Sequence, residues 1–377
     1  MARNQPLILD DIKGDMCRLG YLKILTQISK DRKKYKINHH ADLLEKYVSK
    51  DHKPDEKLGE ELQDKDRKLS NTALIPTGGR AVNYIEFSYR LKIFSQKKQI
   101  FDENGQLYDK LLGSSDENED MTLILQPSDK IFFLKILFDL DREILGEFMK
   151  YAEKKCQNKV TRKDLMNYLM EEIYIQKAKD APQNIKNLKK RQKFRRNLKN
   201  WEKYPAVREK SPEKWNLHEG YAFYRHNGNP RLEWLVDLGF FEKIETSFKT
   251  SKDANAISNA FEQSDIEQPD ILYELGKVFY EEAKPADDDE IKKQVIESYK
   301  KFSKAGYIVV KKTILFSLVC LEFFRKNDAG HDMKTVKIEN IEKVIQYMKQ
   351  ESASSVRVHR DSMGKQTYLK IRVQDFQ

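Results

Sequence analysis

The sequence predicts a mainly α-helical protein with small β-hairpins, an α+β chain made of several modules. Apolar residues recur at helical spacing along the whole chain, and short alternating runs flank some of the turns. The 377 residues are 39% hydrophobic but 34% charged, with a mean hydropathy of −0.77, so they suit several small cores better than one large one. A weak internal repeat also indicates modular construction.

The repeat joins the segment Phe87–Phe101 to the segment Trp234–Phe248. A shift of 147 positions superposes four pairs of apolar residues, which are Phe87 on Trp234, Leu91 on Leu238, Phe94 on Phe241 and Phe101 on Phe248. Each copy is typical of a helix end, a short strand, a polar turn and a second strand or helix cap. We interpret the repeat as a duplication.

The first module is expected at residues 1–126. Apolar spacing predicts a helix at Asp15–Ser29 and a second one at His39–Val48, followed by a charged loop at Ser49–Lys68. A third helix is expected after Thr77, a suitable N-cap, and would begin at the glycine pair 78–79.

The second module is expected at residues 127–268 and opens with a long helix, Lys130–Cys156. Thr161 and Asp164 have the spacing of a capping box, which predicts the start of a helix through Tyr174. A basic insertion follows. The third helix is expected from Asn229, because the next residue, Pro230, suits a first helical turn.

The third module is expected at residues 269–377. Helical spacing predicts Glu290–Ala305, with Gly306 as its stop, and Ile338–Gln350; the run Thr313–Phe324 is apolar almost all round and should be central. Two alternating runs within Val356–Val373, around a turn at Gly364, predict a C-terminal β-hairpin.

Three helices followed by a hairpin, in successive units, resemble the winged-helix arrangement, a variant of the helix-turn-helix. A tandem of such modules is similar to the DNA-recognition arms of Type IIS restriction endonucleases and to the two-module replication initiators of plasmids. The resemblance implies that the third helix of a module enters the major groove and that the hairpin, or wing, contacts the backbone.

The net charge of +10, with a pI near 9.1, is concentrated in one region. Residues 150–215 hold 20 Lys or Arg against 8 Asp or Glu, so the rest of the chain sums to about −2. Within the stretch Asn187–Trp201 there are seven cations and no acid, and Phe194, Leu198 and Trp201 give it one apolar stripe. A docked helix that contacts phosphates is favoured over a solvated connector. The predicted phosphate contacts are Lys189, Lys190, Arg191, Lys193, Arg195, Arg196 and Lys199.

Base contacts are expected from the starts of the third helices, because Arg can pair with guanine and Asn with adenine in the major groove. The residues concerned are Arg80, Asn83 and Tyr84 in the first module, and Arg225, His226, Asn229 and Arg231 in the second. For Arg80 and Arg231 the alternative is a salt bridge to a nearby carboxylate. In the C-terminal hairpin, Arg357, Arg360 and Lys365, with His359, are expected to contact phosphate or the minor groove, or else to protect a sheet edge.

Catalytic motifs are scarce. The three cysteines, Cys17, Cys156 and Cys320, are scattered and form no CxxC, so neither a disulfide framework nor a zinc site is expected. The chain has no GxxxxGK[ST] or GxGxxG motif, and we expect no cofactor or metal. Asp237 with Glu242 and Lys243 only loosely approximates a metal-dependent nuclease centre.

The sequence lacks the order of a signal peptide, and charges interrupt its longest apolar runs, which predicts a soluble cytoplasmic protein, in a prokaryotic cytoplasm or nucleoid, with no membrane partner. The favoured hypothesis is a non-enzymatic protein that binds double-stranded DNA and positions a protein partner in restriction or anti-phage defence, replication or transcription. A nuclease is one alternative. A protein-interaction scaffold, docking through the acidic section Asp253–Glu290, is the other.

Overall fold

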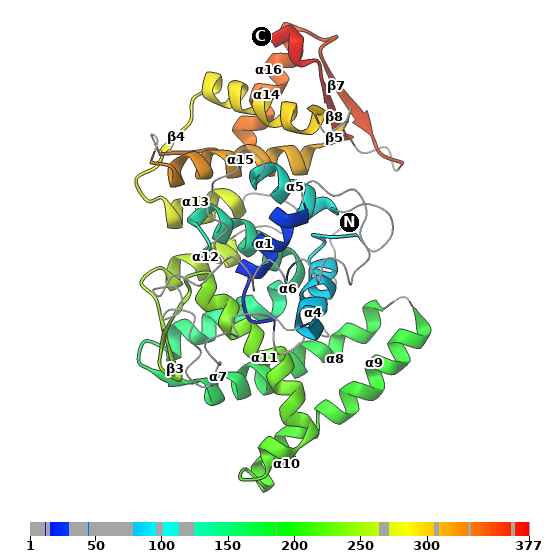
Figure 1. Ribbon diagram of the computed structural model, residues 1–377, viewed down its shortest axis with the longest axis vertical. Coiled ribbons are helices and arrows are strands. Elements are labelled where there is room, and N and C mark those ends of the chain that lie inside the picture. The colour runs from blue at the N-terminus through cyan, green and yellow to red at the C-terminus, as the bar shows by residue number, and fades with distance from the viewer. Residues whose placement is uncertain are drawn as a thin grey trace.

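The computed structural model describes residues 12, 16–29, 44, 78–95, 101–112, 124–185, 187–263, 271–304, 309–330, 333–362 and 366–376. Within these ranges the chain is mostly helical with short strands, as predicted (Figure 1). Except for Leu44, the helix predicted at His39–Val48 and the loop at Ser49–Lys68 lie outside the described residues, as do Thr77, Gly306, Gly364 and Lys365.

The N-terminal region contributes α1 (Gly20–Ser29), α4 (Gly78–Arg90) and α5 (Glu103–Leu112). Helix α1 begins five residues later than the predicted Asp15. The reason is tertiary: the Asp237 carboxylate accepts the Leu19 N–H at 2.8 Å, and the Trp234 indole donates to the Met16 carbonyl at 2.8 Å. Both partners belong to α11 (Glu219–Asp237), which holds this segment in a non-helical path.

The internal repeat is visible in the backbone. Lys92 and Gly239, which are 147 positions apart, both adopt positive φ, 56° and 82°. The hydrogen bonds of the two turns match as well: the Ile93 N–H donates to the Ser88 carbonyl, and the Phe240 N–H donates to the Leu235 carbonyl, both at 2.8 Å. Both helices therefore end in the same left-handed turn.

The repeat residues also contact one another. Phe87 of α4 stacks on Trp234 of α11, with ring centroids 5.0 Å apart. Downstream, Phe94 forms a β-bridge with Phe101 in the first copy. In the second copy the equivalent segments are β2 (Phe241–Ile244) and β3 (Ser247–Thr250), a full hairpin. The two copies therefore pack together at the start of their turns.

Residues 127–250 and residues 288–371 share the order helix, strand, helix, helix, strand, strand, apart from helices inserted into the first region and the short strand β6 (Lys334–Thr335) in the second. In each, the first strand pairs with the last, so the sheet orders are β1-β3-β2 and β5-β8-β7, all antiparallel. The first region comprises α6 (Pro127–Lys155), β1 (Val160–Thr161), α7 (Arg162–Tyr168), α11, β2 and β3. The second comprises α14 (Asp288–Lys304), β5 (Val310–Lys311), α15 (Lys312–Asp328), α16 (Ile338–Glu351), β7 (Val356–Arg360) and β8 (Gln366–Ile371).

Several helices are inserted into the first region between α7 and α11. They are the π-helix η1 (Leu169–Tyr174), α8 (Ile175–Asn184), α9 (Leu188–Trp201), α10 (Tyr204–Lys210) and the short 3-10 helix η2 (Trp215–Leu217). The two regions are linked by α12 (Ala254–Gln263) and α13 (Ile271–Phe279), and β4 (Lys284–Pro285) pairs in parallel with β6 (Lys334–Thr335). A last turn, η3 (Val373–Phe376), follows β8.

Most of the predicted elements are confirmed. The helices predicted at Lys130–Cys156, Glu290–Ala305, Thr313–Phe324 and Ile338–Gln350 correspond to α6, α14, α15 and α16, and the C-terminal hairpin is β7–β8. The Thr161 hydroxyl caps α7 by accepting the Asp164 N–H at 3.2 Å and donates to the Asp164 carboxylate at 2.6 Å. The helix that begins there runs through the π-helix η1, which ends at Tyr174 as predicted, and then continues as α8.

The expected start of the third helix was wrong. Pro230 lies inside α11, which begins at Glu219, rather than in a first turn. Proline removes one backbone donor from a helix. Two side chains add hydrogen bonds to carbonyls of this stretch: Asn227 donates to the Phe223 carbonyl at 3.1 Å, and Arg231 donates to the Asn227 carbonyl at 2.7 Å.

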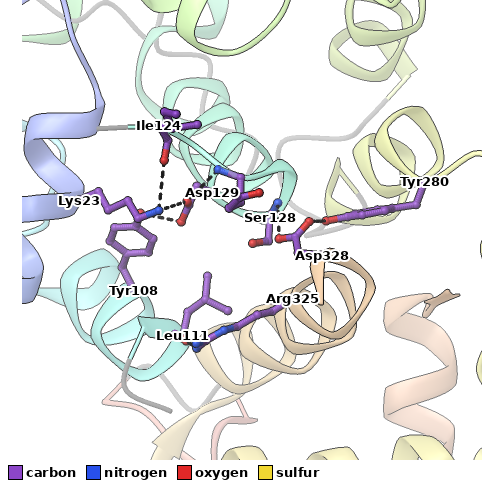
Figure 2. Close-up of polar contacts among 10 residues, drawn as sticks. Lys23, Tyr108, Leu111, Ile124, Ser128, Asp129, Tyr280, Arg325 and Asp328 are labelled. Atoms are coloured by element: carbon purple, nitrogen blue, oxygen red, sulfur yellow. Dashed lines mark hydrogen bonds and ion pairs between the residues drawn. The ribbon is translucent and has the colours of Figure 1, made fainter. Parts of the chain in front are cut away.

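A buried polar junction fixes the N-terminus of α6 against α1, α5 and α15 (Figure 2). Asp129 accepts from Lys23 at 2.7 Å and from the Tyr108 hydroxyl at 2.8 Å, and it also caps the Gln126 N–H. On the other side of the helix end, Asp328 accepts the Ser128 N–H and the Tyr280 hydroxyl (Figure 2). Two carboxylates at a helix N-terminus complement its dipole. The junction joins the early helices to the C-terminal region.

Candidate nucleic-acid interface

The basic stretch forms α9, one arm of a helical hairpin with α8, at the edge of the molecule (Figure 1). Its apolar stripe packs inward: the Trp201 ring stacks on Phe223 of α11 at 4.6 Å, Phe194 meets Trp201 edge-on at 5.4 Å, and Leu198 is 9% exposed. An edge contact between Trp201 and Tyr174 of the π-helix completes the anchor. The C-terminal end of α9 is thus docked on the body.

The opposite face of α9 is an exposed row of cations. Lys189, Lys193, Arg195, Arg196 and Lys199 are all exposed, and none of them forms an ion pair or side-chain hydrogen bond with the part of the chain that the structure describes. Lys189 with Lys193, and Arg195 with Lys199, are four residues apart, where like charges repel across one helical turn. These five charges therefore add no attractive interaction with the described residues to the stability of the isolated chain.

Cations near α9 behave differently. Arg208 makes a bidentate pair with Glu171, at 2.6 and 2.9 Å, and the Tyr224 hydroxyl donates to the same carboxylate at 3.1 Å. Lys177 of α8 pairs with Glu143 and Glu147 of α6. Cations that lie against the body of the protein therefore form ion pairs. The exposed cations of α9 point away from the body and form none within the described ranges.

The charge of this insertion equals that of the whole chain. Residues 175–215 hold 14 Lys or Arg and 4 Asp or Glu, a balance of +10, and the complete chain also carries +10. All other residues therefore sum to zero. Such a local field attracts polyanions much more strongly than the same charge spread evenly would.

Two of the predicted phosphate contacts need separate description. Arg191 is half-buried, and its Nε–H donates to the Ile185 carbonyl at 2.8 Å, which ties the turn between α8 and α9. The side chain of Lys190 lies outside the described residues. Arg191 thus stabilises the turn between α8 and α9, whereas the exposed cations of α9 form no such hydrogen bond with the described residues.

Arg231 was misassigned as a base contact. It is 0% exposed, and its Nε and Nη2 donate to the two carboxylate oxygens of Asp141 at 2.7 and 2.9 Å. Asp141 lies at a kink in α6, with non-helical backbone angles, and is also fully buried. The alternative recognised from the sequence, a salt bridge, is the one that the structure contains.

Tyr84 was also misassigned. Its ring is 2% exposed and lies 4.9 Å from that of Tyr21, and its hydroxyl accepts the Arg18 N–H at 3.1 Å. Burial raises the pKa of Tyr84 well above its ordinary value. Asn83 on the same helix is half-buried, and the side chain of Arg80 lies outside the described residues.

Of the other residues predicted on α11, Arg225 is exposed, whereas His226 and Asn229 are half-buried. Arg225 and Phe223 are two residues apart on the helix, a rotation of roughly 200°. Because Phe223 stacks on Trp201, Arg225 points away from α9. The structure therefore does not bring Arg225 onto the face that carries the α9 cations.

In the C-terminal hairpin, Arg357, His359 and Arg360 are exposed. Two further cations that the sequence analysis did not single out lie on the partner side of this hairpin, Lys370 on β8 and Arg372 just after it. The signal was present as alternation, because residues two apart on a strand share a face. The hairpin thus carries more positive charge than predicted.

The loose nuclease constellation is not assembled. Asp237 accepts from Leu19 and pairs with Arg18 at 2.8 Å, and Lys243 lies 3.4 Å from the Glu233 carboxylate. Burial raises the pKa of Asp237 to about 6. Glu242 is exposed on β2. Among the described residues no group of three His, Cys, Asp or Glu side chains is placed to hold a metal ion.

The section proposed as a protein-docking surface has a buried apolar part and an exposed acidic part, in which Glu281, Glu282, Asp287, Asp288 and Asp289 are exposed. Helices α12 and α13 pack against α6, and the apolar residues Ile257, Phe261, Leu272 and Leu275 are buried.

No described helix is both long and apolar enough to cross a bilayer. Comparison with known proteins adds no assignment: no protein-family model, no curated protein and no solved structure matches this chain significantly.

Proposed function

We propose that this chain is a duplex DNA-binding protein built from winged-helix modules, in which α9 grips the phosphate backbone. The observation that carries the proposal is the row of five exposed α9 cations without a described intramolecular partner. Phosphates of a nucleic acid would be the partners of these cations. Each neutralised phosphate releases condensed counterions, which favours binding entropically.

The order of elements supports the winged-helix part of the proposal. Residues 127–250 and 288–371 each end in a helix followed by an antiparallel hairpin, which is the arrangement that the resemblance requires. In the first of these regions the basic insertion lies directly before the third helix. The cations of α9 point away from its contact with α11, where Trp201 stacks on Phe223, so we assign phosphate contacts to α9 and no base contact to the leading end of α11.

Positioning a protein partner is the second part of the proposal. With Asp237 and Lys243 committed to structural pairs, the nuclease alternative loses the residues on which it depended. We therefore place the chemistry in a partner, within a restriction or anti-phage defence, replication or transcription assembly.

A matched pair of triple variants tests the DNA grip. The first, Arg195→Gln with Arg196→Gln and Lys199→Gln, removes three charges from α9. The control, Lys154→Gln with Lys155→Gln and Lys159→Gln, removes three exposed charges near the end of α6. Both have the same net charge, so only local placement differs.

Anisotropy titrations with labelled duplex should show at least tenfold weaker binding for the α9 variant and less than a threefold change for the control. Equal losses in both variants would mean that general charge, and not α9, attracts the nucleic acid. Gel-shift series with duplex DNA, single-stranded DNA and double-stranded RNA decide the substrate class. Preference for double-stranded RNA would overturn the assignment to DNA, whose wider major groove admits a helix.

A further inference from the structure

The sheet β5-β8-β7 has one buried and one exposed face. Val310, Val356, Leu369 and Ile371 are at most 4% exposed and line the buried face, against α15 and α16. Alternation along the strands places the remaining side chains outward. Those on the outer face are Lys311, Arg357, His359, Tyr368, Lys370 and Arg372.

Like charges meet directly across this outer face. In the strand register, Arg357 lies opposite Lys370, and His359 lies opposite Tyr368. Directly opposed like charges destabilise an antiparallel pair. Lys311 is compensated by Glu103 of α5, but Arg357, Lys370 and Arg372 form no ion pair within the described part of the chain. This is the second place where the sequence positions cations to repel one another.

Protection of a sheet edge does not explain the pattern. Edge strands commonly carry Arg or Lys to prevent pairing with another chain. Arg357 is on β7, an edge strand, and could serve in this way. Lys370 is on β8, the central strand, which has neighbours on both sides. Edge protection therefore does not account for the cation at Lys370.

The outer face of this sheet and the α9 cations lie along one side of the molecule. In Figure 1 the hairpin β7–β8 and helix α9 occupy the upper and lower parts of the same edge. The buried face of the sheet packs on α15 and α16, whereas α9 packs on α8 and, through Trp201, on α11. Both cationic faces are the ones opposite these packed faces.

We propose that the outer face of the sheet β5-β8-β7 is a second phosphate-contacting surface, and that one duplex spans it and α9. This inference rests on the proposed function and deepens it by assigning the footprint. A compact chain of 377 residues has a radius of gyration of about 21 Å and so spans roughly 55 Å. At 3.4 Å per base pair this corresponds to about 16 base pairs. A duplex of about half this length is expected to reach only one of the two surfaces.

The test combines duplex length with a sheet-face variant, Arg357→Gln with Lys370→Gln and Arg372→Gln. Its control is the same Lys154, Lys155 and Lys159 variant, which has equal net charge. Far-UV circular dichroism and urea unfolding verify that each surface variant is folded. Affinity is measured on duplexes of about 8 and about 30 base pairs, lengths chosen on either side of the estimated span.

On the long duplex the sheet-face variant should bind at least tenfold more weakly than the control, and its log–log salt slope should be shallower by about 2.7. On the short duplex its affinity should be within twofold of the control, because α9 alone holds that ligand. An unchanged affinity at both lengths, or an equal loss at both lengths, overturns the spanning model. If the wild-type protein binds neither duplex, the proposed function itself has failed, which is a distinguishable result.

Discussion

Replacement of the buried Arg231–Asp141 pair tests whether this pair is structural. Arg231→Met alone leaves the Asp141 carboxylate in the core without its two donors, and Asp141→Leu alone leaves an uncompensated guanidinium. Removing one partner of a buried pair costs about 3–5 kcal/mol of unfolding free energy. Each single variant should therefore be strongly destabilised.

The double variant should be much less affected, because an apolar pair of similar volume avoids desolvation of both charges. It still loses the Arg231 hydrogen bond to the Asn227 carbonyl and the contact between the guanidinium and the Tyr174 ring. The loss of these two interactions lowers the unfolding free energy of the double variant by roughly 2 kcal/mol. We expect the double variant within about 2 kcal/mol of the wild type, and a coupling energy of at least about 4 kcal/mol.

Urea unfolding of the four proteins gives the cycle, and anisotropy titration of the double variant gives its duplex affinity. Unchanged DNA affinity is expected, since a fully buried guanidinium cannot reach a base. A single-variant cost below about 1 kcal/mol, or a double variant as unstable as the sum of the two singles, would show that Arg231 and Asp141 are not coupled in the core.

Three further outcomes are expected. Burial raises the pKa of Asp237 to about 6 from 3.8, so the fold holds a proton that the unfolded chain releases; stability should fall by up to about 3 kcal/mol as pH rises from 4 to 7, and urea melts of Asp237→Asn should lack this fall. Lys92→Gly should stabilise the protein by roughly 0.5–1 kcal/mol and Gly239→Ala should destabilise it by about 1 kcal/mol, because both positions have positive φ; opposite signs in thermal melts would contradict the shared turn. Trp201→Ala removes the stack on Phe223, so the measured duplex affinity should fall several-fold although no charge changes, and unaltered affinity would show that the anchor is dispensable.

The helices and the terminal hairpin were largely predictable because their signals are local. The apolar spacing of Ile338–Gln350 and the all-round apolar character of Thr313–Phe324 each determine an element without reference to distant residues. The repeat was also readable from its four apolar pairs, whereas the matching left-handed turns at Lys92 and Gly239 were found only in the backbone.

The place of Pro230 inside α11, the burial of Arg231 and the register of the C-terminal hairpin were not predicted from the sequence. A proline is typical of a first helical turn, but Pro230 lies inside α11. Side-chain hydrogen bonds of Asn227 and Arg231 to helix carbonyls are found next to it. Arg231 resembles an exposed cation beside a proline, and its partner Asp141 is 90 residues away on another helix. The opposition of Arg357 to Lys370 required the strand register, which the turn at the tip of the hairpin does not reveal from sequence.

The most direct test of the central claim is the salt dependence of duplex binding by the unmodified protein. Five exposed α9 cations contacting phosphates predict that the logarithm of the association constant falls linearly with the logarithm of salt concentration, with a slope of about −4.5 or steeper. A slope near zero, or no binding even at about 50 mM salt, would contradict the assignment of α9 as a phosphate grip.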